Sequence, residues 1–155
     1  MRHYIFIILL QVCCYSCAQQ IINAGQLVGT KWKIESPQNV IRTIEFHEDY
    51  YTKNIQVLLG EEMDTSKLDY EYYLTNEEPS VFDKHKGKQK KGMYLVVRNG
   101  YNKEPLYHLM WYYTIMSYSP QKLVLFKKAE ELKEGHIVIG TPPRDVILTL
   151  ERIYE

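Results

Sequence analysis

Cysteine is absent from most of this sequence. The chain has 155 residues and three cysteines, and Cys13, Cys14 and Cys17 all lie among the first 17 positions. Residues 19–155 therefore offer no thiol for a disulfide bond or a thiolate metal site. A domain of this length can instead be held together by its hydrophobic core, because it buries roughly two thirds of the surface that its unfolded chain exposes.

Short catalytic motifs are also missing. The sequence has no Gly-x-Ser-x-Gly turn and no glycine-rich phosphate loop, and its histidines show no His-Glu-x-x-His spacing. His47, Glu48 and Asp49 are consecutive, but neighbouring residues of a strand point to opposite faces and do not converge on a metal. We therefore expect a protein that is not an enzyme and that needs no metal or cofactor.

The chain has no excess of either charge. It contains 19 Lys and Arg residues and 19 Asp and Glu residues, so it has no general field that would attract nucleic acid. The strongest local feature is the basic stretch from Lys84 to Lys91. This stretch is either a solvated hairpin loop or a tip that binds an acidic partner.

Residues 1–18 have the pattern of a secretory signal. Arg2 and His3 are followed by the apolar run 4–10, and Ser16 and Ala18 have the small-x-small spacing of a cleavage site. The run is too short to span a bilayer, which takes about 20 residues. We expect cleavage after Ala18. One alternative is a buried N-terminal strand or helix. The other is a lipid anchor at Cys17, and we expect the protein to bind a membrane only if this anchor is present.

Most of the chain from residue 30 onward shows the alternation of half-buried strands. The clearest case is 68–74, where Leu68, Tyr70, Tyr72 and Leu74 share one face. Further strands are predicted at 30–35, 40–48, 51–59, 93–98, 106–117, 123–127 and 146–155, with a hairpin turn at 119–122. Residues 60–67 are predicted to be a polar break. Residues 129–135 favour a short helix, 136–139 a small strand and 19–28 a lead-in with one helical turn.

These segments predict one all-β domain over residues 19–155. About eight to ten strands with short turns imply antiparallel neighbours, and an all-β chain of this size closes as a sandwich or as a barrel. The sequence has no linker, internal repeat or long helix that would indicate a second domain.

A resemblance favours the barrel. Leu27, Gly29 and Trp32 open the first strand as in the lipocalin-like domains of exported bacterial proteins, and 113–125 and 148–153 are similar to that family's late strands. The resemblance implies an antiparallel up-and-down β-barrel, secreted or periplasmic, or anchored to the envelope by lipid. Classical lipocalins have Gly-x-Trp, one residue tighter than Gly29 to Trp32.

The resemblance also implies two structural roles. Trp32 would fill the closed end of the barrel, and Arg152 of the last strand would lie across its ring as a cation–π partner. The alternative is that Trp32 is an ordinary core residue and Arg152 a surface charge.

Aromatic residues on the predicted strands are the candidates for ligand binding. Of 14 tyrosines, only Tyr4 and Tyr15 lie within residues 1–18. An open barrel end would place such rings around a largely apolar pocket for a small hydrophobic or aromatic ligand, or the rings would fill the interior completely. The alternative function is a non-catalytic interaction module for an envelope protein. The candidate ligand-binding residues are Tyr70, Tyr72, Tyr94, Tyr107, Trp111 and Tyr113; Tyr118 also falls on a predicted strand.

Overall fold

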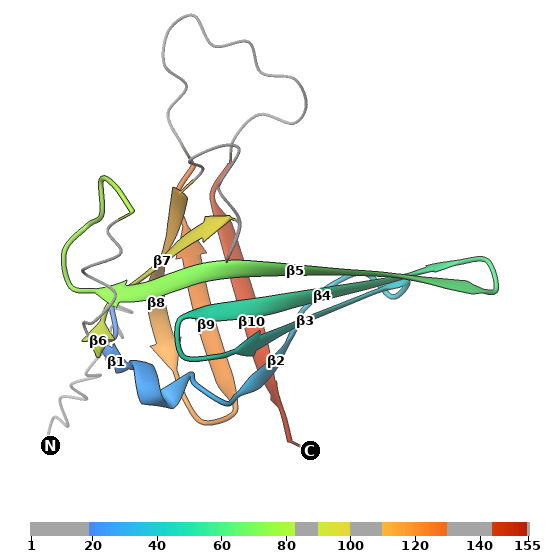
Figure 1. The fold of residues 1–155 in the computed structure, drawn as a ribbon, viewed down its shortest axis with the longest axis horizontal. Helices are drawn as coiled ribbons and strands as arrows, with labels where there is room; N and C mark the ends of the chain where they lie inside the picture. The colour runs from blue at the N-terminus through green and yellow to red at the C-terminus, as the bar shows by residue number, and fades with distance from the viewer. Residues whose placement is uncertain (1–18, 83–89, 100–109, 130–143, 155) are drawn as a thin grey trace, which may run out of the picture.

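The computed structural model describes residues 19–82, 90–99, 110–129 and 144–154 (Figure 1). The elements are β1 (Ile22–Asn23), η1 (Ala24–Gln26), β2 (Lys31–Ile34), β3 (Val40–Phe46), β4 (Tyr50–Leu59), β5 (Glu62–Thr75), β6 (Lys91–Gly92), β7 (Tyr94–Asn99), β8 (Met110–Tyr118), β9 (Lys122–Lys127) and β10 (Val146–Ile153). The predicted signal at 1–18 and strand at 136–139 lie outside the described residues, as does the predicted helix at 129–135 apart from its first residue. Among the described residues, no helix has the length and apolar character needed to cross a membrane.

Eight antiparallel strands close into a barrel. Their order is β10-β2-β3-β4-β5-β7-β8-β9, so strands that follow one another in the chain pair, apart from β6, which pairs with β1 outside the barrel. The barrel closes where Leu150 and Arg152 of β10 pair with Ile34 and Trp32 of β2. In Figure 1 the strands β3 to β5 run across β8 to β10, which enclose the other side of the interior. The prediction of an all-β, up-and-down barrel is confirmed, and the sandwich alternative is excluded.

The hairpin of β4 and β5 extends beyond the rest of the barrel (Figure 1). The predicted polar break at 60–67 is wrong, because only Gly60 and Glu61 form a turn and β5 begins at Glu62. Gly60 has a φ of 67°, a left-handed conformation that glycine adopts without strain. Residues 62–69, in the extended part of this hairpin, are all exposed. Neither face of this part of β5 packs on the core, so its sequence is not required to alternate between apolar and polar residues.

The N-terminal lead-in covers one end of the barrel, here called the base. Its short helix η1 matches the helical turn predicted within 19–28. Gly29, with a φ of 74°, turns the chain into β2 while its N–H donates to the carbonyl of Phe46 at 2.9 Å. Ile22 and Leu27 are almost fully buried, so the lead-in contributes its own side chains to the core at the base.

A β-bulge in β8 aims a ring at this base. The register with β9 shifts between Ile115 and Ser117, which leaves Met116 as the extra residue. A strand without this bulge would turn Tyr118 to the outer face, whereas here Tyr118 contacts Trp32 edge to face at 6.2 Å between ring centroids.

Candidate functional site

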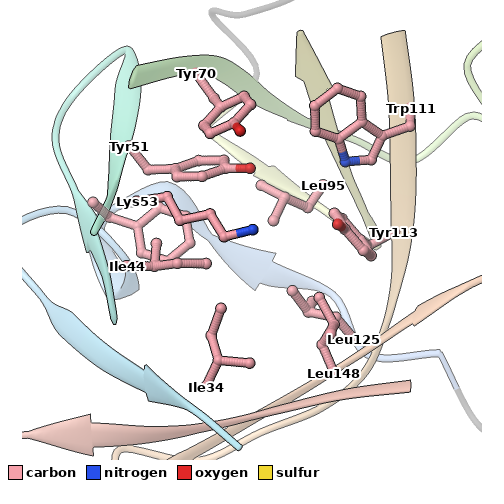
Figure 2. Close-up of a pocket in the computed structure, with 11 residues that line it drawn as sticks. Ile34, Ile44, Tyr51, Lys53, Tyr70, Leu95, Trp111, Tyr113, Leu125 and Leu148 are labelled. Atoms are coloured by element: carbon pink, nitrogen blue, oxygen red, sulfur yellow. The ribbon is translucent and has the colours of Figure 1, made fainter. Parts of the chain in front are cut away.

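The end of the barrel opposite the base holds a cavity inside the sheet. Its volume is about 50 Å³, which is room for a few water molecules, since one water needs about 10–15 Å³. Most of the wall is aliphatic or aromatic, as Figure 2 shows. The lining residues are Ile34, Ile44, Phe46, Tyr51, Lys53, Tyr70, Leu95, Trp111, Tyr113, Leu125 and Leu148.

Three rings form one side of this cavity. Tyr51 and Tyr70, which are directly opposite each other on β4 and β5, stack with their ring centroids 5.1 Å apart. Trp111 of β8 meets Tyr70 edge to face at 5.6 Å. Tyr51 is buried, whereas Tyr70 and Trp111 are only partly buried. The outer two rings can therefore shift with less loss of packing than the inner one.

Hydroxyl groups give the cavity part of its polar character. Burial raises the pKa of Tyr51 and of Tyr113, and Tyr70 lies close enough to both to raise them further. Burial likewise raises the pKa of Tyr70. All three hydroxyls are therefore neutral at physiological pH and can donate or accept hydrogen bonds.

Lys53 is the charged residue of the cavity wall. It lies between Tyr51 and Ile55 on the inward face of β4, and Figure 2 shows its amine pointing into the cavity. Burial, and then the positive charge of Arg42, lowers the pKa of Lys53 from its usual 10.5. The amine thus sits where a positive charge is disfavoured.

The structure brings together three of the residues predicted from the sequence. Tyr70, Trp111 and Tyr113 all line the cavity. Tyr72 also points inward, but its hydroxyl donates to the carbonyl of His47 at 2.7 Å and it is not part of the wall. Tyr94 pairs with Thr114 on the outer face of the sheet. Tyr107, and most of the basic stretch 84–91, lie outside the described residues.

The two residues predicted to be structural lie together at the base. Trp32 is completely buried, and its indole N–H donates to the hydroxyl of Thr30 at 2.6 Å. The guanidinium carbon of Arg152 lies 6.0 Å from the centroid of the Trp32 ring and 5.3 Å from that of Tyr154. This arrangement has the geometry of a cation–π contact.

Sequence reasoning missed Tyr51 and Lys53 as cavity residues. A signal was present, because Lys53 falls in the apolar phase of β4, between Tyr51 and Ile55. A lysine in that phase points into the barrel unless the strand is irregular. The aliphatic wall residues have no such signal, since any core position of a barrel can be aliphatic.

No protein-family model matches the chain, and no curated protein sequence matches it. Within the described ranges, no group of three or more His, Cys, Asp or Glu residues is placed to hold a metal ion. What the barrel can bind therefore follows from its own cavity.

Proposed function

We propose that this protein is a lipocalin-like binding protein that takes a small hydrophobic or aromatic ligand into the cavity beside Tyr70 and Trp111. One observation carries the proposal: a closed barrel has an internal cavity with a mainly apolar wall and a few polar groups, which is the usual composition of a small-molecule site. The secretory signal predicted from the sequence at residues 1–18 supports a role outside the cytoplasm.

The ligand must enlarge the cavity. A cavity that binds benzene has a volume of about 150 Å³, whereas this one measures about 50 Å³. Tyr70, Trp111 and Tyr113 are the wall rings that are only partly buried. Tyr70 and Trp111 contact each other on one side of the cavity, so their outward rotation is a movement that makes room at low cost in buried surface.

Binding of N-phenyl-1-naphthylamine, an uncharged probe whose fluorescence rises in apolar surroundings, tests the proposal. We expect saturable binding to the wild type and its loss in Leu148→Trp, because the indole would fill the cavity. Ile147→Trp is the matched control, since Ile147 is the adjacent residue on β10 and is 69% exposed. Absence of binding, or equal binding by the two variants, would contradict the proposal.

A second measurement uses the native protein. Native mass spectrometry of gently purified protein should show a retained small molecule that is released on unfolding. The same spectra give the mass of the mature N-terminus. A mass that starts at residue 19 supports the secretory signal, whereas an acylated Cys17 supports a lipid anchor.

A further inference from the structure

Two cations on the inward face of the barrel have no acidic partner among the residues that the structure describes. Arg42 on β3 and Lys53 on β4 share the inward face, because the register pairs them with Ile55 and Ile44 respectively. Arg42 is also opposite Ile34 of β2, and Lys53 is opposite Leu68 of β5. All four cross-strand neighbours are therefore aliphatic.

Neither cation is neutralised within the described part of the chain. Their side chains form no ion pair there, and the Nε of Arg42 is buried without a hydrogen-bond acceptor. Burying a donor without a partner is unfavourable by about 1–3 kcal/mol, and more for a charged group. Two such groups side by side repel each other as well, so the fold retains an arrangement that is unfavourable in the empty barrel.

We propose that Arg42 and Lys53 form an anion-binding subsite, and that the ligand carries one acidic group at the end of its apolar or aromatic body. This inference rests on the proposed function, because Lys53 lines the same cavity and Arg42 is its diagonal neighbour on β3, close enough for the two charges to interact. An acidic group beside the Lys53 amine would accept charge-assisted hydrogen bonds, which are about twice as strong as neutral ones. The hydroxyls of Tyr51 and Tyr113 are further donors on the cavity wall.

The apolar part of such a ligand has a defined direction. Figure 2 shows the Lys53 amine in the middle of the cavity, with Tyr70 and Trp111 on one side and Leu125 and Leu148 on the other. An acid bound at the amine would therefore leave its hydrophobic body among the rings of Tyr70 and Trp111, where the wall is exposed enough to move.

A matched pair of probes tests the subsite. 8-Anilinonaphthalene-1-sulfonate has the aromatic framework of N-phenyl-1-naphthylamine and adds one sulfonate, so the two differ in the acidic group alone. We expect the sulfonate to bind the wild type at least about tenfold more tightly, which corresponds to about 1.4 kcal/mol. Equal affinity, or tighter binding of the uncharged probe, would overturn the subsite.

Variants assign the effect to the two cations. Lys53→Met and Arg42→Met should each weaken sulfonate binding about tenfold, the effect of losing one charge-assisted hydrogen bond, and leave binding of the uncharged probe within about twofold. Lys53→Arg should retain sulfonate binding, because it keeps the charge. Lys33→Met removes a lysine that is exposed on the outside of β2 and should change neither affinity.

Folding and the proposed function are checked separately. Lys53→Met removes a buried charge, so we expect its melting temperature to be at least that of the wild type. If Arg42→Met does not fold, Lys53→Met and Lys53→Arg decide the question. Equal weakening of both probes would overturn the subsite but leave the proposed function, whereas failure of both probes to bind the wild type would contradict the proposed function itself.

Discussion

The two ends of the barrel each contain a tryptophan, and the two rings are held very differently. Trp32 at the base is completely buried, its N–H is bonded and the lead-in segment packs beside it. Trp111 at the other end is partly exposed and borders a cavity. Each ring has a cation 6.0 Å from its centroid, Arg152 at the base and Lys127 at the cavity end.

The difference indicates that the base contributes mainly to stability, whereas the opposite end is suited to binding. At the base, Ile22, Leu27 and Trp32 are almost fully buried, and no buried side-chain polar atom of the described residues there lacks a hydrogen-bond partner, as a stable core requires. The cavity end has unfilled volume and two cations without partners among the described residues. Arrangements that are unfavourable for stability are expected where a protein binds something.

The largest expected effect is the difference in the free energy of unfolding between alanine variants of Trp32 and Trp111. Trp32→Ala should lower the free energy of unfolding by about 3–5 kcal/mol, because it leaves a cavity in a filled core. Trp111→Ala should lower it by about 1–2 kcal/mol, since Trp111 is only partly buried and borders space that is already unfilled. Urea denaturation of both variants measures the difference. Equal losses would contradict the distinction between a filled base and an adaptable opposite end.

An intermediate effect should appear at alkaline pH. The pKa of Tyr51 in the folded state is raised well above 10, so above pH 10 the unfolded chain releases this proton while the folded protein keeps it. Stability therefore falls as pH rises above 10, by up to about 1.4 kcal/mol per pH unit for each such tyrosine.

Tyr51→Phe isolates this contribution at the cavity end. Between pH 8 and 11, the variant should lose about 1 kcal/mol less stability than the wild type. Each protein's own value at pH 8, where tyrosine is neutral in both states, is the reference. Identical pH profiles for the two proteins would show that Tyr51 ionises as easily in the fold as in the unfolded chain.

Much of the barrel could be predicted from the sequence, because most strands have one buried and one exposed face. The alternation around Tyr70 and Tyr72 on β5 marks such a face. The outer part of the same strand, residues 62–67, was not predicted, since these residues are exposed on both faces and carry no apolar alternation. Closure into a barrel depends on the pairing of β10 with β2, which joins segments far apart in the sequence.

The candidate site was only partly predictable for a related reason. Tyr70, Trp111 and Tyr113 were expected as aromatic residues on strands, and Tyr94 shared that description although it lies on the outer face. Which rings point inward depends on the phase of each strand. The phase of β8 is fixed by its pairing with β7 rather than by its own sequence, in which Trp111, Tyr112 and Tyr113 are consecutive. Lys53 could be recognised from its phase alone, but whether Arg42 lies beside it depends on the register between β3 and β4.

The smallest expected effect is the loss of stability when Arg152 or Lys127, the cations beside the two tryptophans, is replaced. Arg152→Met should lower the free energy of unfolding by about 0.5–1 kcal/mol, because a guanidinium that is partly buried against a tryptophan forms a cation–π contact of about this strength. Lys127→Met should have a smaller effect, since an ammonium group is more strongly hydrated and its partner Trp111 is only partly buried. Thermal unfolding of the four single variants Arg152→Met, Trp32→Phe, Lys127→Met and Trp111→Phe, and of the double variants Arg152→Met/Trp32→Phe and Lys127→Met/Trp111→Phe, gives the coupling energy at each end. A larger coupling at Lys127 would mean that Trp111 is fixed as firmly as Trp32, and the cavity end would then lack the freedom to move that ligand entry requires.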